Sequence, residues 1–180
     1  MSVPGGPERP FFGKYRGTVI NNIDPLMRGR LLVQVPDVLG PVPSSWAEAC
    51  TPLAGPTGPP MGVYLVPPIG AGVWVEFEQG DPDYPIWVGC RWGAASDVPP
   101  LARVGLPVSP NLVLQSLAQH TLMISDMPPT PATGGIILKS TTGASIVVND
   151  SGIYIQNGKG ASIVLTGPTI TMNMGALTIV

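Results

Sequence analysis

Few side chains in this sequence have the type and spacing that catalysis or metal binding requires. His120 is the only histidine of the chain, so one chain cannot supply the histidine clusters that commonly hold zinc. In the repeat described below, His120 takes the place of Ala144 and Ala161, just before a strand. We therefore interpret it as a turn residue. The alternative is a ring of three His120 side chains on a trimer axis, which could hold a metal or an anion.

Carboxylates and nucleophiles give no stronger signal. Asp81 and Asp83 are spaced like a carboxylate pair, but they lie in a Pro-rich turn, where Asp commonly accepts hydrogen bonds from its own backbone. A glycosidase would also need a cleft and an acid with a raised pKa, and the sequence signals neither. Cys50, Ser44 and Ser45 have no base nearby to activate them. The sequence therefore predicts no enzyme, no catalytic residue, no cofactor and no metal site.

The two cysteines, Cys50 and Cys90, have no metal-binding spacing. We expect reduced, partly buried thiols, and a disulfide between them stays open as an alternative.

The four tryptophans, Trp46, Trp74, Trp87 and Trp92, could stack on sugars or bases. A nucleic-acid groove would also need clustered Lys and Arg, whereas the nine basic residues are spread along a chain of net charge −2. We therefore expect no nucleic-acid partner, and we expect the tryptophans to pack inside a barrel or at subunit contacts.

Composition indicates an all-β protein. Charged residues make up 11% of the chain, while 23 Gly and 23 Pro separate many short β-branched runs. No run of 18 apolar residues occurs, so no membrane-spanning helix is expected. The N-terminus lacks the apolar core of a signal peptide. We therefore expect the chain to be made in the cytoplasm without a signal peptide.

A strand repeat organises the last third of the chain. Residues 145–157 align without a gap on residues that lie 17 positions further on. Apolar residues alternate with others at the period of a strand. The aligned pairs are Ile146 with Ile163, Val148 with Leu165, Ile153 with Ile170, and Ile155 with Met172. Similar short strands extend upstream to residue 112, interrupted by the Pro/Thr/Gly loop 127–134. This ladder is typical of a β-solenoid.

The ladder has too little interior for one chain. Each short strand offers two inward apolar side chains, which is too little to offset the entropy of ordering it. We therefore predict that three chains share one axis in an intertwined β-prism, with a monomeric solenoid as the alternative. The predicted trimer core consists of Ile146, Val148, Ile153, Ile155, Ile163, Leu165, Ile170 and Met172.

The strand pattern in the first half of the chain predicts a small closed barrel of the OB type. After a flexible arm (1–12), short strand-like runs at 15–23, 30–35, 63–66, 73–78 and 86–90 follow without a helix between them. Alternation predicts that Val73, Val75 and Phe77 point into the barrel core. The expected organisation is an OB domain at 13–93, a linker at 94–111 and a β-helix spike at 112–180.

Four stretches of the first domain carry a family resemblance. They are Lys14-Tyr-Arg-Gly-Thr-Val, Gly29-Arg-Leu-Leu-Val-Gln-Val-Pro, Trp46-Ala and Pro67-Pro-Ile-Gly-Ala-Gly-Val-Trp-Val-Glu-Phe-Glu-Gln-Gly-Asp-Pro-Asp-Tyr-Pro-Ile-Trp-Val-Gly. Together they closely resemble the OB domain of central spike proteins in contractile injection machines. These include phage baseplate assembly protein V and the VgrG proteins of type VI secretion. The strand repeat follows in the order that this family has.

The resemblance implies a non-catalytic structural spike. It implies a homotrimer that sits on a hub at the centre of the baseplate, leads the inner tube and pierces the target envelope, within a phage tail or phage-tail-like particle. Because the chain has no long N-terminal hub domain, the hub is expected to be a separate polypeptide. Spikes of this family often carry a PAAR-type tip protein with its own metal, and the apolar end of the chain is the expected docking site. Its residues are Leu177, Ile179 and Val180.

Two other functions compete with this interpretation. One is a stand-alone OB module that binds oligosaccharide or single-stranded nucleic acid. The weaker one is a cell-wall hydrolase.

Overall fold

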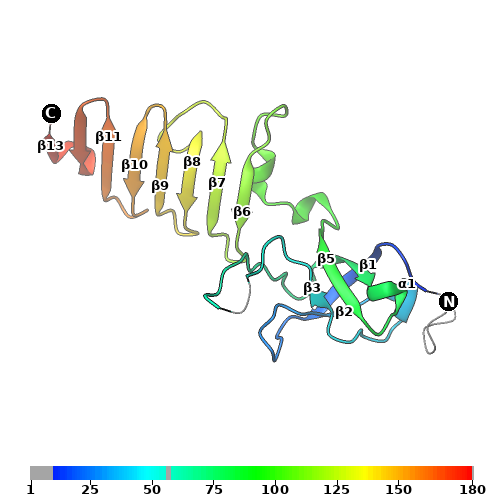
Figure 1. Ribbon diagram of the computed structural model, residues 1–180. Helices are drawn as coiled ribbons and strands as arrows, with labels where there is room; N and C mark the ends of the chain where they lie inside the picture. Colours follow the sequence, from blue (N-terminus) through cyan, green and yellow to red (C-terminus); the bar gives the residue numbers. More distant parts are fainter. Residues whose placement is uncertain (1–9, 56–57, 180) are drawn as a thin grey trace. The chain divides into compact units, whose positions relative to one another are not determined.

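The computed structural model describes residues 10–55 and 58–179, and the chain divides into two compact units, 1–93 and 94–180 (Figure 1). Nearly all regular structure in both units is β-strand, which confirms the all-β fold expected from composition. None of the helices among the described residues is long and apolar enough to span a membrane.

Unit 1 is built on one strongly curled sheet. Its elements are β1 (Tyr15–Asn21), β2 (Leu32–Gln34), α1 (Pro36–Leu39), β3 (Glu48–Ala49), β4 (Gly72–Phe77), the short 3-10 helix η1 (Glu78–Gly80) and β5 (Pro85–Arg91). The strands lie in the order β2-β1-β4-β5-β3. Only the β3–β5 pair is parallel among the pairs described.

The two edge strands of this sheet meet and close it into a barrel. Leu31, just before β2, exchanges backbone hydrogen bonds of 3.1 and 2.8 Å with Ala47, just before β3. The Ser44 N–H donates to the Val33 carbonyl at 2.9 Å, and the Val33 N–H donates to the Ser44 hydroxyl at 3.1 Å. The backbone groups that a sheet edge would leave unpaired are therefore satisfied at this seam.

The barrel has its own hydrophobic core. Along β4 the burial alternates, so that Val73 and Val75 are fully buried and Phe77 is 5% exposed. Trp87 of β5 is also buried, and its indole N–H donates to the Gly29 carbonyl at 3.0 Å. Phe77 packs against the ring of Tyr15 with a centroid distance of 5.6 Å.

One expected strand of the barrel is absent. The run 63–66 forms no strand. Its first residue, Val63, donates its backbone N–H to the Leu53 carbonyl at 3.0 Å. Prolines flank the run at 59–60 and 67–68 and offer no N–H to a ladder. The prediction of a strand here was wrong, and Tyr64 and Leu65 of this run are exposed.

Unit 2 is a single antiparallel sheet in which each strand pairs with the next along the chain (Figure 1). The strands are β6 (Leu112–Gln115), β7 (Thr121–Ser125), β8 (Gly135–Lys139), β9 (Ser145–Asn149), β10 (Gly152–Gln156), β11 (Ser162–Thr166), β12 (Thr169–Met172) and β13 (Leu177–Ile179). Tight turns such as Asp150–Ser151 and Gly167–Pro168 connect only antiparallel neighbours. One chain therefore forms a flat ladder and does not wind into a solenoid by itself.

The segment 94–111, which we expected to be a linker, is folded as part of unit 2. It contains two 3-10 helices, η2 (Ala95–Asp97) and η3 (Pro100–Arg103), and Leu101 packs against the buried side chains of the sheet. The amide of Asn111 donates to the Leu101 carbonyl at 2.8 Å. Pro99 and Pro100 fix the backbone of the turn that presents Leu101.

Removing a core ring should destabilise the barrel. We expect Phe77→Ala to cost about 3–5 kcal/mol, because truncating a buried Phe leaves a cavity. The matched control is Phe12→Ala, since Phe12 is 69% exposed. All four tryptophans lie in unit 1, so urea unfolding followed by tryptophan fluorescence reports on this barrel. Equal midpoints for the two variants would show that Phe77 does not pack in the core.

Candidate functional site: the apolar face of the second sheet

One face of the sheet in unit 2 consists entirely of aliphatic side chains. Strand pairing places two from each of the eight strands into two parallel rows. The first row is Leu114, Leu122, Leu138, Ile146, Ile155, Ile163, Met172 and Leu177. The second row is Leu112, Ile124, Ile136, Val148, Ile153, Leu165, Ile170 and Ile179. We call this surface the apolar face.

The apolar face is open to solvent in a single chain. Leu112 is 68% exposed, Ile146 and Val148 are each 40% exposed, and Ile179 is 55% exposed. The members of the face on β11 and β12 are half-buried. Soluble monomers rarely expose a continuous apolar surface of this extent, so such a surface marks a contact with another molecule.

Part of the opposite face of the same sheet is buried within the chain. Met123, Ile137 and Val147 point to that side and are 7%, 4% and 1% exposed. Leu101 and Tyr154 are among the side chains packed against them. The unit therefore has a small core of its own on one side of the sheet, and its uncovered side is the apolar face.

The apolar face carries no charge. The ionisable groups that follow residue 111 include Asp126, Asp150 and Lys159, which lie in the connections between strands, and Lys139, which points to the opposite face. The long connection 126–134 is held near the end of β9 by Asn149, whose amide donates to the carbonyls of Thr130 and Thr133 at 2.8 and 3.1 Å. Copies of the face can therefore approach one another without burying an ionised group.

All eight residues predicted for a trimer core lie on the apolar face, as do Leu177 and Ile179 of the predicted tip-docking site. Val180, the third predicted docking residue, lies outside the described residues. The rows extend beyond the predicted set to β6, β7 and β8. The alternation of these strands was visible in the sequence on both sides of the loop 127–134, but they were not included in the predicted core.

Two family models match the chain, one on each unit. The Type VI secretion system/phage-baseplate injector OB domain matches residues 15–92. The phage baseplate V C-terminal trimerisation domain matches residues 111–178. The chain belongs to the phage baseplate V family. A search among curated proteins finds no match.

Family membership confirms the resemblance drawn from the sequence and the OB domain in the first half of the chain. Both matched domains are structural parts of baseplates and injectors, not enzymes, and the second is a trimerisation domain. They support a homotrimer with a spike-like structural role in a phage baseplate or type VI secretion context. All residues of the apolar face except Ile179 lie within the baseplate V trimerisation domain.

The residues that could have carried chemistry are not brought together. His120 is exposed before β7, and its backbone N–H donates to the Ser116 hydroxyl at 3.1 Å. Asp81 accepts a hydrogen bond of 3.0 Å from the Asp83 N–H within their turn. No group of three or more potential metal ligands occurs within 10–55 and 58–179. Ser44 is part of the seam that closes the barrel.

The cysteines differ from expectation in one respect. Cys50 and Cys90 are free thiols, but both are exposed and not partly buried. Cys50 follows the short edge strand β3, and Cys90 lies beyond the irregularity that the pairing of β4 with β5 shows between Trp74 and Val75.

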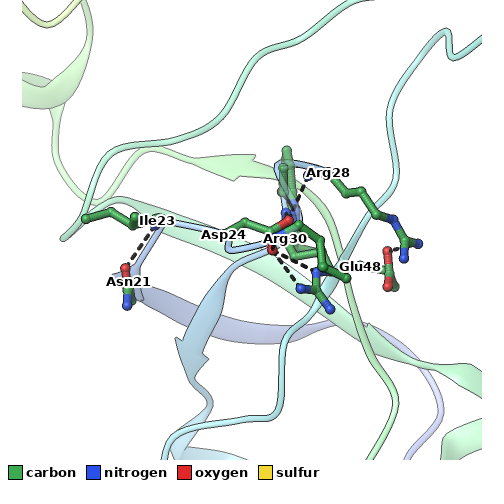
Figure 2. Close-up of polar contacts among 9 residues, drawn as sticks. Asn21, Ile23, Asp24, Arg28, Arg30 and Glu48 are labelled. Carbon is green, nitrogen blue, oxygen red and sulfur yellow. Dashed lines mark hydrogen bonds and ion pairs between the residues drawn. The ribbon is translucent and has the colours of Figure 1, made fainter.

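The baseplate V OB domain contains a polar cluster that the sequence did not reveal (Figure 2). The buried carboxylate of Asp24, in the loop between β1 and β2, accepts backbone hydrogen bonds from Leu26 at 2.9 Å, Arg28 at 2.8 Å and Arg30 at 3.2 Å. The Arg30 guanidinium donates two more, from Nε at 3.0 Å and Nη2 at 2.7 Å. The sequence signal was Asp24-Pro with an arginine six positions further on.

These contacts hold the Asp24 carboxylate in its charged form. The hydrogen-bonded Arg30 guanidinium, opposed by desolvation and aided by the backbone donors, holds the pKa of Asp24 well below its usual range. Arg30 also lies over the Trp46 ring, 5.4 Å from its centroid. Beside it, Arg28 pairs with Glu48 at 2.8 Å. Trp87 is thus enclosed in the barrel core, and Trp46 is half-buried with Arg30 over its ring.

Neutralising Asp24 should weaken the OB domain in a pH-dependent way. Because its pKa is lowered on folding, the carboxylate contributes stability above its unfolded pKa of about 3.9, and loses it as pH falls toward the folded value. We expect Asp24→Asn to lower the urea midpoint at neutral pH, and the difference from wild type to shrink below about pH 4. The control is Asp37→Asn, at an exposed aspartate. A loss of equal size at about pH 3 and at neutral pH would contradict this role for the charge.

Proposed function

We propose that this chain is the non-catalytic central spike of a contractile baseplate, formed when three copies bury their apolar faces around one axis. The uninterrupted apolar face carries this proposal, because all of it except Ile179 lies within the trimerisation domain and one chain leaves it uncovered. Three sheets, one from each chain, would enclose a β-prism whose interior is lined by both rows of the face.

The free energy gained by burying the apolar face favours association over a solvated monomer. Full burial of one Val, Leu, Ile or Met side chain contributes about 1.5–3 kcal/mol. Two such side chains from each of eight strands therefore contribute on the order of tens of kcal/mol per chain, even if half of the area is already buried. Association costs about 4–15 kcal/mol in lost translation and rotation. The apolar contribution exceeds that cost.

The proposed mechanical role follows from the way in which the prism would be built. Every strand of the sheet pairs with its sequence neighbour, so the backbone along the ladder is hydrogen-bonded without metal or cofactor. We propose that the OB domains trimerise on a separate hub that joins the inner tube, and that the stiff prism leads the tube through the target envelope. The chain would be made in the cytoplasm without a signal peptide and then enter a phage tail or phage-tail-like particle.

We also propose that a PAAR-like tip protein covers the C-terminal end of the prism. Leu177 and Ile179 are 52% and 55% exposed and end the two rows of the apolar face. β13 is the last strand of the sheet, so one of its edges has no neighbour within the described chain. Apolar side chains beside an open edge favour a capping partner. Any metal at this end would belong to that partner.

A charge on the apolar face should abolish the trimer. In Ile163→Asp three carboxylates would be buried around the common axis, and each unpaired buried charge is costly. We expect a monomer or insoluble protein, measured by the mass in solution; Ile146→Asp should behave alike. The control is Gln156→Glu, which adds a charge to the exposed opposite side of β10. A soluble Ile163→Asp trimer with an unchanged melting temperature would place this side chain outside the common core.

Removal of the last strand should release the tip protein. Deletion of residues 177–180 removes the end of both rows and exposes β12 as the new edge. We expect purified particles to contain the spike but to lose the tip protein, as measured by quantitative mass spectrometry of the particle. Full occupancy of the tip protein on the truncated spike would refute the docking site.

A further inference from the structure

The OB domain has an exposed apolar surface that neither its own core nor the apolar face of the second sheet uses. It is formed by the loop between β1 and β2 and by the segment 61–69. Its members are between 58% and 83% exposed, namely Ile23, Leu26, Met27, Tyr64, Leu65 and Ile69. We call this surface the loop patch.

Contacts within the domain show that the two segments lie side by side. The Asn22 amide donates to the Pro67 carbonyl at 3.1 Å. A Cβ on Gly29 would lie 3.5 Å from Cε2 of Tyr64, so the end of the loop packs directly against the second segment. The backbone of Gly70 donates to the Val19 carbonyl at 2.8 Å, which fixes the other end of the segment to β1.

Hydrogen bonds to the Asp24 carboxylate fix the loop that carries Ile23, Leu26 and Met27, and Figure 2 shows those from Arg28 and Arg30. The carboxylate accepts hydrogen bonds from Leu26, Arg28 and Arg30. These donors lie on both sides of Met27, the exposed tip of the loop. At that tip, Met27 is 83% exposed and has φ = +52°, a conformation that non-glycine residues rarely adopt. A strained backbone that presents an apolar side chain to solvent indicates a functional contact, prepared before the partner arrives.

We propose that the loop patch packs against the loop patches of the other two copies in the trimer, so that the OB domains form a second apolar contact beyond the β-prism. This inference rests on the trimeric assembly proposed above. A trimerisation domain at residues 111–178 tethers three OB domains in one particle. Such tethering raises the effective concentration of each patch near its copies to about the millimolar range.

The electrostatics of the patch suit contact between identical surfaces. The segment 61–69 has no charged residue, and the charged residues of the loop are Asp24, Arg28 and Arg30. Asp24 pairs with Arg30 at 2.7 Å, and Arg28 pairs with Glu48 at 2.8 Å. Identical surfaces that carry unpaired charge would repel one another, whereas these patches meet without an uncompensated charge.

Thiol accessibility in the full chain tests this contact. The variants are Met27→Cys and, as the control, Val42→Cys at a 61% exposed apolar residue of the same domain outside the patch. Both are made in a Cys50→Ser, Cys90→Ser background, because the native thiols are exposed. In protein whose mass is that of a trimer, we expect a maleimide to label Met27→Cys about tenfold or more slowly than Val42→Cys. With Ile163→Asp added, the two rates should become similar.

A nitroxide on the Met27→Cys thiol provides a second readout that needs no monomeric variant. We expect dipolar broadening in the fully labelled trimer, and its loss when labelled chains assemble with an excess of unlabelled chains. Equal labelling rates at both positions in a proven trimer would overturn the contact, as would protection of Met27→Cys that persists in a monomer. Protection that arises only in the assembled particle would indicate that the loop patch contacts the hub, and it would also overturn the proposed contact between copies. A wild-type chain that is monomeric by mass would instead refute the proposed spike itself.

Discussion

The constraint on which this molecule depends is that a sheet one layer thick cannot bury both of its faces. In unit 2, Leu101 and Tyr154 pack against Met123, Ile137 and Val147, which are buried on one side of the sheet. On the other side, no other part of the described chain covers the two aliphatic side chains that each strand contributes. The hydrophobic effect then favours any arrangement that brings such faces together, and identical copies are the partners that the trimerisation domain supplies.

The two domains solve the problem of sheet edges differently. The OB barrel joins its edges through Leu31 and Ala47 and fills its interior with its own side chains, such as Val73 and Val75. The second sheet remains open at β6 and β13 and flat between them. A closed barrel has a complete core within one chain, whereas an open sheet with an apolar face gains most of its stability on assembly. The chain thus combines a domain that has a complete core of its own with a domain whose apolar face is left uncovered.

Much of this architecture follows from the sequence because strands with a period of two reveal which side chains share a face. The pairs Ile146–Ile163 and Ile155–Met172 were visible as a repeat, and they occupy the same row of the apolar face. Val73, Val75 and Phe77 are buried in the barrel, on the side that their alternation indicated. Local patterning suffices in these stretches because each strand pairs with its sequence neighbour or lies across a short turn.

The features that escaped prediction depend on contacts between distant residues or on backbone geometry. Leu101 packs against the sheet from a segment that begins with Pro99 and Pro100 and is hydrogen-bonded to the buried Asn111. Asp24 and Arg30 form a cluster only because the loop returns its own N–H groups to one carboxylate. The run 63–66 is apolar enough for a strand but lacks partners between its flanking prolines. A one-dimensional pattern does not encode such pairings.

The most direct test of the spike is the mass of the unmodified chain in solution, measured by sedimentation equilibrium over a wide range of protein concentrations. One chain has a mass of 18.7 kDa. The account predicts a single species of three chains that persists on dilution, because the apolar faces contribute far more than association costs. A soluble, folded species of one chain across the whole range would contradict it, since the apolar face would then be stable in water.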